Sequence, residues 1–237
     1  METCRGIILN TVPFSDTQKI IHLYAKEKGY LSMLSPSSVF KRKNAPLHLL
    51  QITEVEYLEN PKGGLHKLKS AAPLVQLPAL YFDVVKMNII LLWGEILSRL
   101  LRNEGPNEPL FDFITRSVEY LNASEGDTAN FNLYFLYRLA APLGYRINTD
   151  TWQPGALFNP HDGCFHLPGT TANTISGPNT ARIIHRLCTC QTADLAAIPL
   201  NRDARNILLD TVLAYYRIHL GADFNLKSLD ILREIFS

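Results

Sequence analysis

The spacing of apolar residues along the chain changes after residue 78. In residues 4–75 the apolar residues come in short runs that Gly, Pro, Asn and Ser separate. The clearest run, QITEVEYLE at residues 51–59, mixes Ile52, Val55 and Tyr57 with polar residues in near alternation. Such alternation is typical of strands that bury one face. About five strands of this kind in roughly 75 residues predict a small closed antiparallel barrel.

From residue 80 onward the apolar residues recur with the period of a helix. Residues 81–102 carry apolar side chains broadly around the helix axis, which predicts a helix buried on most sides. The further predicted helices span residues 110–121, 130–141, 178–190, 201–220 and 228–236. Asn201 is placed to cap one of them and Gly221 to end it. The sequence therefore predicts an α+β protein, with a barrel domain in residues 1–79 and a helical domain in residues 80–237.

Regular periodicity is lost in residues 145–177, which we expect to form a loop module with a hairpin inside the helical domain. Its central stretch, LFNPHDGCFHLPG, combines metal-ligating residue types with prolines and glycines. The ligating types are His161, Asp162, Cys164 and His166. These types suit a metal site, whereas the prolines and glycines around them suit a turn. At this point both interpretations stay open.

The composition bounds the class of protein. With 237 residues, 46% of them hydrophobic, the chain is long enough to bury a sizeable core. The most apolar run, residues 87–101, contains Asn88, Glu95 and Arg99 and is too short to cross a bilayer. Charged residues near the N-terminus leave no signal-peptide core. We therefore expect a cytoplasmic protein that does not enter a membrane.

The cysteines agree with that expectation. The four are scattered, as suits free thiols in a reducing compartment: Cys4, Cys164, Cys188 and Cys190. The last two lack the C-x-x-C spacing of a zinc knuckle. We interpret them as small helix residues, at least one of them buried.

Charge is distributed unevenly along the chain. Residues 1–79 hold ten Lys and Arg against six Asp and Glu, whereas the rest holds thirteen against sixteen. The cluster Lys41-Arg42-Lys43 is the sharpest, and three cations in one loop suit a phosphate backbone. Possible stacking faces for bases are Tyr24, Tyr30 and Phe40. A solvated basic loop would give the same pattern, so single-stranded nucleic-acid binding is one of two interpretations.

Two weaker patterns lie in the helical domain. Arg182, His185 and Arg186 share one face of a predicted helix, where they either meet an acidic partner or form a solvated surface. The pair His161-Asp162, with His166, suits a metal-dependent hydrolase only if it lies on a helix, and here it lies in a turn. The chain has no phosphate-binding glycine loop, no nucleophile elbow and no H-E-x-x-H helix. We therefore expect no enzyme activity.

The order of these features resembles the bacterial RecO recombination mediators over almost the full length. The segments that carry the resemblance are GIIL (6–9), FSDT (14–17), KIIHLY (19–24), KGYL (28–31), KRK (41–43), LLQITEVEY (49–57), GLHKL (64–68), YYRIHLG (215–221) and LKSL (226–229). The resemblance implies an N-terminal OB-fold and an α-helical domain with an inserted zinc-ribbon-like module. It implies binding to single- and double-stranded DNA, annealing of complementary strands, and action with RecR to load RecA onto DNA coated by single-stranded DNA-binding protein. It implies no cofactor, and a place at the nucleoid.

The resemblance also supplies candidate contact residues. The candidates for DNA are Lys41, Arg42, Lys43, Arg5, Lys19 and Lys67, and those for a protein partner are Arg182 and Arg186. An alternative within the same fold is a scaffold that recruits repair partners and has little DNA affinity of its own, because the excess positive charge of the barrel is modest.

The chain departs from the family in the loop module. Many RecO proteins carry four zinc-ligating cysteines there, around a hairpin that residues 158–163 resemble. Here residues 145–155 contain no cysteine, and Cys164 takes a turn position of the hairpin. Since a structural zinc site needs four ligands, we expect no bound metal. We expect apolar packing around Trp152, Leu157, Phe158 and Phe165 in its place, with His161 and His166 facing solvent.

Overall fold

The computed structural model describes residues 1–41, 47–126, 128–170, 176–221 and 226–235. Its contacts divide the chain into two compact units, Met1–Ala123 and Ser124–Ser237. The change from strands to helices falls near residue 78, as the spacing of apolar residues predicts. Three helices nevertheless belong to the same compact unit as the barrel, so compactness and secondary structure divide the chain at different points.

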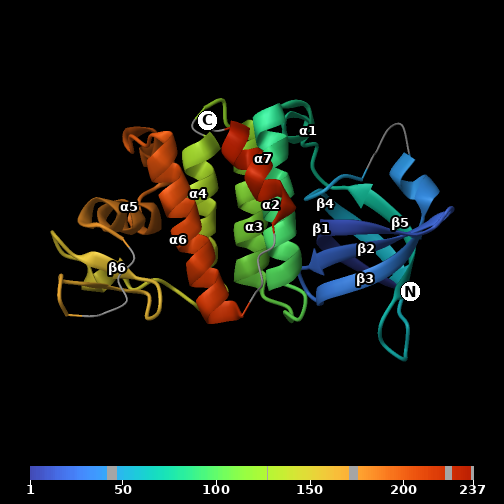
Figure 1. The fold of residues 1–237 in the computed structure, drawn as a ribbon. Helices are drawn as coiled ribbons and strands as arrows, with labels where there is room; N and C mark the ends of the chain where they lie inside the picture. Colours follow the sequence, from blue (N-terminus) through green and yellow to red (C-terminus); the bar gives the residue numbers. More distant parts are fainter. Residues whose placement is uncertain (42–46, 127, 171–175, 222–225, 236–237) are drawn as a thin grey trace. The chain divides into compact units, whose positions relative to one another are not determined.

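The first unit begins with a closed five-stranded barrel (Figure 1). Its strands are β1 (Glu2–Ser15), β2 (Gln18–Ala25), β3 (Gly29–Pro36), β4 (Ile52–Leu58) and β5 (His66–Pro73). The order around the barrel is β1-β2-β3-β5-β4, and the 3-10 helix η1 (Ser37–Lys41) follows β3. This is the barrel that the pattern predicts, followed by helices as expected of an OB-fold chain.

One strand pairing differs from the prediction of an antiparallel barrel. β3 and β5 run parallel, with Met33 opposite His66 and Leu34 opposite Lys67. The other four neighbouring pairs are antiparallel. Directions cannot alternate around a closed ring with an odd number of strands, so at least one pair in a five-stranded barrel must be parallel. The inward residues, such as Ile21, Met33 and Leu68, fill the barrel and are almost fully buried.

Three helices complete this unit: α1 (Pro78–Phe82), α2 (Val84–Leu100) and α3 (Glu108–Ala123). The helix predicted over residues 81–102 is wrong at its start, where Asp83 interrupts it. Asp83 has extended backbone, and its carboxylate accepts hydrogen bonds from the backbone N–H groups of Val85 and Lys86. A side chain that caps the next helix in this way ends the previous one.

The turn between β2 and β3 fastens the barrel to the segment after α2. Gly29 has φ +72°, and a Cβ atom there would lie 2.5 Å from the carbonyl oxygen of Glu104. The N–H of Tyr30 donates to the same oxygen at 3.1 Å. The hydroxyl of Tyr24 donates to the carbonyl oxygen of Gly105 at 2.9 Å. This close approach of two backbones explains why a glycine stands at residue 29.

In its described residues, the second unit contains four α-helices and a loop module that lies beside α5 and α6 (Figure 1). Its elements are α4 (Thr128–Leu139), η2 (Thr149–Thr151), β6 (Leu157–Asn159), β7 (Cys164–His166), α5 (Pro178–Thr189), η3 (Thr192–Ala197), α6 (Arg202–Leu220) and α7 (Lys227–Ile235). The predicted caps of α6 are confirmed: the Asn201 side chain accepts from the N–H of Ala204, and Gly221 has φ +59°. The short helix η3 was not predicted. Among the described residues, no helix combines the length and apolar character that a bilayer crossing needs.

Candidate nucleic-acid interface

An aromatic pair lies on the outer face of β2 and β3. The rings of His22 and Tyr30 stack with their centroids 5.7 Å apart and their planes 20° apart. His22 lies opposite Ser32, and its Nδ1 shares a hydrogen bond of 2.9 Å with the Ser32 hydroxyl. Both rings stay partly exposed. Burial and the nearby Arg102 guanidinium lower the pKa of His22, so the stacked ring is neutral near pH 7.

A row of aliphatic side chains crosses the same face and ends at a lysine. The strand register places Val12 beside Ile20, Ile20 beside Leu34, and Leu34 beside Lys67. Paired residues of neighbouring strands point to the same face. Val12 is 40% exposed, Ile20 and Leu34 are half-buried, and Lys67 is exposed. The face therefore offers apolar and aromatic surface for bases together with a cation for a phosphate.

Two other predicted contacts of the barrel lie toward opposite ends of its strands. Arg5 lies on β1 opposite Glu54, close to the β2–β3 turn, whereas Lys19 lies near the start of β2. The two are about seven residues apart along the strand direction, or roughly 23 Å at about 3.3 Å per residue. Lys19 shares the inward register of Ile21 and Ser35 and lies at the rim of the barrel.

The basic cluster can be placed only in part. The 3-10 helix η1 is tied to the barrel rim, because the Ser37 N–H donates to the Thr17 carbonyl oxygen at 2.8 Å. Lys41 is the last residue of η1, and its side chain is not described. Arg42 and Lys43 lie outside the described residues. Of the described candidates, Arg5 and Lys67 point outward like the stacked rings, and Lys67 lies at the end of the aliphatic row.

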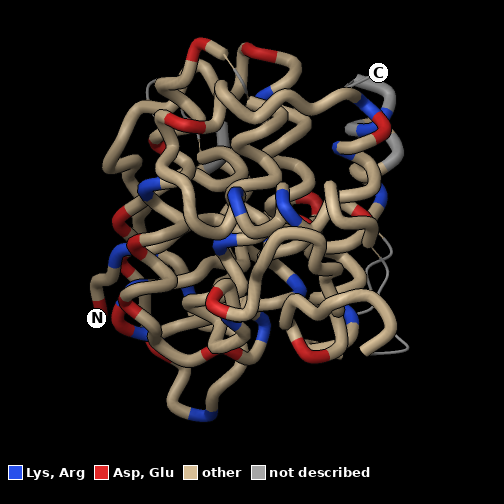
Figure 2. The backbone as a smooth tube through the Cα atoms, turned by 90° about the vertical axis from the view of Figure 1, so that its left-hand side faces the viewer, with Lys and Arg blue, Asp and Glu red and all other residues tan. Residues whose placement is uncertain are grey.

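Carboxylates pair with the cations near Arg5. Lys26 Nζ lies 2.6 Å from Glu108 Oε1 and 3.2 Å from Asp112 Oδ1. Lys28 Nζ lies 3.5 Å from Glu2 Oε2. Basic and acidic positions are also interspersed along the chain as a whole (Figure 2). The excess of positive charge in residues 1–79 therefore does not by itself define a binding face.

Of the three stacking candidates, the structure places one on this face. The prediction for Tyr24 is wrong: its side chain is fully buried, its hydroxyl bonds to Gly105, and burial raises its pKa to about 12. The side chain of Phe40 is not described, and Tyr30 is in place. Sequence reasoning missed His22, although it is an outward polar residue in an alternating strand. The alternation of residues in the strands could not predict that Arg102 lies near this face, because Arg102 follows the end of α2.

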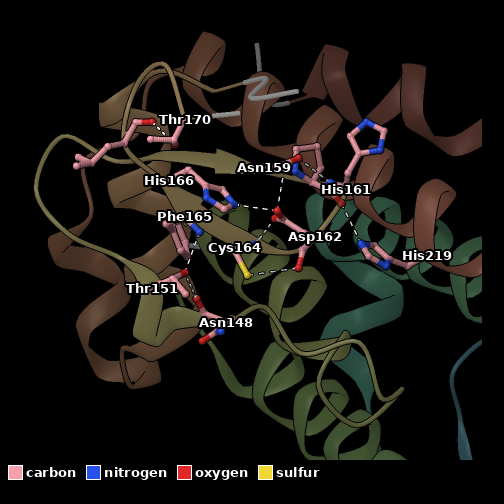
Figure 3. Close-up of polar contacts among 12 residues, drawn as sticks. Asn148, Thr151, Asn159, His161, Asp162, Cys164, Phe165, His166, Thr170 and His219 are labelled. Carbon is pink, nitrogen blue, oxygen red and sulfur yellow. Dashed lines mark hydrogen bonds and ion pairs between the residues drawn. The ribbon is translucent and has the colours of Figure 1, made fainter. Parts of the chain in front are cut away.

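In the second unit, Asp162 holds the turn of the β6–β7 hairpin (Figure 3). Its Oδ1 accepts a hydrogen bond from the Cys164 N–H at 2.9 Å. Its Oδ2 accepts from Asn159 Nδ2 at 3.0 Å and lies 2.8 Å from His166 Nε2. His161 is exposed as predicted and its ring points away from Asp162, but the prediction for His166 is wrong, because this ring turns to Asp162.

This geometry does not suit a hydrolase centre. Both carboxylate oxygens of Asp162 accept hydrogen bonds within the turn. The rings of His161 and His166 point in different directions. Among the described residues, no three histidines, cysteines or acids lie close enough together to share a metal ion.

Apolar and aromatic packing holds the hairpin, as the sequence predicts. Phe158 and Phe165 are almost fully buried, and their ring centroids lie 5.3 Å apart. Tyr215 of α6 lies against Phe158, with centroids 6.1 Å apart. Trp152 stacks on His185 of α5 at 4.5 Å. The hairpin is therefore packed against two helices of its own unit.

Backbone contacts fasten the same hairpin. The ring of His219 donates from Nε2 to the carbonyl oxygen of Pro160 at 2.9 Å. The hydroxyl of Tyr215 donates to the carbonyl oxygen of Tyr145 at 2.8 Å. Gly163 has φ +68°, and the Tyr215 hydroxyl lies close above it. Two aromatic residues one helical turn apart on α6 thus hold the start of the loop module at Tyr145 and the hairpin turn at Pro160.

The predicted surface of Arg182, His185 and Arg186 on α5 is not formed by all three side chains. Arg182 is exposed and donates to the side chain of Asn179 at 2.7 Å. Arg186 is half-buried. His185 packs against Trp152 and Phe165, and burial lowers its pKa. His185 therefore has a packing role, although its spacing from Arg182 and Arg186 predicts that all three share one surface.

Comparison with known proteins agrees with this architecture. Residues 1–76 match the family "Recombination protein O N terminal", and residues 81–152 match "Recombination protein O C terminal". The chain is similar to the DNA repair protein RecO of Phocaeicola vulgatus, with 32% identity over 98% of both chains. It is similar to the DNA repair protein RecO of Porphyromonas gingivalis, also with 32% identity over 98% of both chains. The RecO of Bacteroides fragilis is 30% identical over 98% of this chain and 97% of its own. The chain therefore belongs to the RecO family of DNA repair proteins.

Proposed function

We propose that this chain is a DNA-binding recombination mediator. It binds single- and double-stranded DNA, anneals complementary strands and, with RecR, loads RecA onto DNA coated by single-stranded DNA-binding protein. Family membership over nearly the whole chain supports the proposal. The observation that carries it is the partly exposed His22–Tyr30 stack, with Arg102 beside it and Lys67 on the same barrel face.

Single-stranded DNA suits this face better than a duplex does. Each base stacked on an aromatic side chain contributes about 1–3 kcal/mol to binding. In a duplex the base faces are stacked on each other, so that the protein reaches only phosphates and groove edges. Lys67 and Arg102 attract phosphates in both cases. We therefore expect both forms to bind, the single strand more tightly.

Stacking is also compatible with annealing. A base whose flat face lies on Tyr30 keeps its Watson–Crick edge available to a complementary strand. Cations on the same face lower the repulsion between two phosphate backbones. None of these steps breaks a covalent bond, so the proposed role needs neither a catalytic residue nor a cofactor. The proposal places the protein in the cytoplasm, at the nucleoid.

An annealing assay tests this function. Two complementary oligonucleotides, one with a fluorophore and one with a quencher, are mixed with and without the protein. We expect the wild-type chain to accelerate quenching and Tyr30→Ala to slow it toward the rate without protein. Addition of RecR should then allow RecA to load onto DNA coated by single-stranded DNA-binding protein. Absence of acceleration by the wild-type chain would contradict the proposal.

The scaffold alternative is favoured by the ion pairs of Lys26 and Lys28, which neutralise part of the barrel's positive charge. It predicts that RecR is retained by the immobilised chain although single-stranded DNA does not bind. The mediator is expected to bind single-stranded DNA and the scaffold is not, so a DNA-binding assay with the same immobilised chain distinguishes them.

A further inference from the structure

A pocket of about 470 Å³ lies in the second unit, where α4 and α5 end. Arg138 is in the last turn of α4, Cys188 and Thr189 are at the end of α5, and Arg146 and Thr149 come from the segment between them. The volume falls in the range of small-ligand sites, about 300–1,000 Å³. None of the interactions described above for the barrel face or the hairpin turn uses these five side chains.

Two guanidinium groups line this pocket, and no carboxylate does. Within the described part of the chain, no ion pair joins Arg138 or Arg146 to an acidic side chain. Arg138 donates one N–H to the carbonyl oxygen of Cys188 and lies over the ring of Tyr134. An arginine has five N–H donors, so this single bond leaves several others for a ligand. Arg146 is exposed.

The nearby thiol does not supply the missing negative charge. Burial raises the pKa of Cys188 to about 12, although Arg138 and Arg146 act in the opposite direction. The thiol is therefore neutral at physiological pH. Both guanidinium groups therefore border the pocket without a carboxylate or a thiolate on its lining.

We propose that this pocket is a second anion site, which binds a phosphate group through Arg138 and Arg146. Planar guanidinium groups match the oxygen geometry of phosphate and can bind it in bidentate fashion. Thr149 and Thr189 also line the pocket, and the Thr189 hydroxyl donates to the carbonyl oxygen of His185 at 2.8 Å. The phosphate is either part of a DNA backbone or a free phosphate. Only the first case rests on the proposed function.

Titration of the full chain with inorganic phosphate, at constant ionic strength with chloride as the reference, tests the site by calorimetry. We expect the wild-type chain to bind phosphate and Arg146→Gln to bind it about tenfold more weakly or worse, since a hydrogen bond to a charged group is lost. The matched control is Arg217→Gln, an exposed arginine of α6 outside the pocket, which should bind like the wild type. A thermal melt of each variant checks that it is folded.

A second arm identifies the source of the phosphate. If the ligand is a DNA backbone, Arg146→Gln also weakens oligonucleotide binding and reduces the salt slope by about one. If the ligand is free phosphate, oligonucleotide binding is unchanged while phosphate binding is lost. Either result supports the site. It is overturned if the wild-type chain binds no phosphate, or if Arg146→Gln binds it as the wild type does. The phosphate arm does not depend on DNA binding, so the site can fail while the proposed function stands, and the reverse.

Discussion

The hydroxyl oxygen of Tyr215 lies 3.0 Å from the position that a Cβ atom on Gly163 would occupy. Gly163 is in the turn of the β6–β7 hairpin with φ +68°, and Tyr215 is on α6. Two requirements therefore meet at one residue, a left-handed backbone and the close approach of a tyrosine. Only glycine satisfies both without strain.

We expect Gly163→Ala to lower the free energy of unfolding by about 1–3 kcal/mol, because a left-handed non-glycine residue is strained and its methyl group meets Tyr215. Urea unfolding measures this change. The control is Gly155→Ala. Gly155 has φ +85°, but the space around its Cβ position is open. The loss of unfolding free energy in Gly155→Ala comes from backbone strain alone, so it should be smaller than the loss in Gly163→Ala. Equal losses would show that the Tyr215 contact is unimportant.

The loop module should not need a metal. Phe158, Phe165 and Tyr215 pack the hairpin, and Asp162 holds its turn through hydrogen bonds. We therefore expect a chelator to leave the thermal midpoint unchanged, and elemental analysis to find no stoichiometric zinc. A drop in the midpoint after chelation, reversed by zinc, would contradict this account of the hairpin.

Stability should fall as the pH drops below about 6.5, the ordinary pKa of histidine. Burial lowers the pKa of His185 in the folded chain, and the pKa of His22 and of His48 is lowered as well. Between the folded and unfolded pKa values the unfolded chain binds more protons. The stability is thus fully present above the unfolded value and is lost as the pH falls through this window.

The variant His185→Gln isolates one of these groups. We expect the difference in unfolding free energy between pH 7.5 and pH 5.5 to be smaller in this variant than in the wild type. His161→Gln, at an exposed position of the same unit, serves as the control and should keep the wild-type difference. If the difference in unfolding free energy is the same in His185→Gln as in the wild type, this ring does not contribute to the loss of stability at low pH.

Much of the fold follows from the sequence because alternation and helical spacing are local. QITEVEYLE predicts a strand since Val55 and Tyr57 point inward and must be apolar. Asn201 and Gly221 predict the ends of α6 because caps act within one turn. Asp83 was missed, because a single capping residue inside a long apolar stretch does not disturb the average spacing.

The candidate site could be predicted only in part, because it depends on which segments cover which face. Tyr24 and Tyr30 both point outward from neighbouring strands, yet the segment at Gly105 covers the first and leaves the second partly exposed. His22 meets Tyr30 through strand register and ring stacking. Arg102 comes from the end of a helix. Neither relationship has a fixed spacing in the sequence.

Removing a stacking ring should weaken DNA binding. We expect Tyr30→Ala to lower affinity for single-stranded DNA by about 1–3 kcal/mol, or roughly 5- to 150-fold, because one base loses its aromatic platform. Duplex affinity should change less. The control is Phe82→Ala, which removes a ring 87% exposed on α1 of the same unit. If both variants bind single-stranded DNA like the wild type, the proposed face is wrong.

The charge on this face is tested by Lys67→Gln. Each phosphate contact releases condensed counterions, so loss of one contact should reduce the slope of log affinity against log salt by roughly 0.7 for a single strand. The control is Lys28→Gln, which removes the same charge from a lysine paired with Glu2. A Lys67 variant with the wild-type slope would exclude this lysine from the interface.

If the barrel binds single-stranded DNA, the affinity of the wild-type chain for an oligonucleotide must depend on the salt concentration. Fluorescence anisotropy with a labelled oligonucleotide, from low to physiological ionic strength, gives the affinity at each salt concentration. We predict measurable binding at low salt that falls linearly on logarithmic axes as salt rises. Absence of binding at the lowest ionic strength would show that the barrel is not a DNA-binding domain.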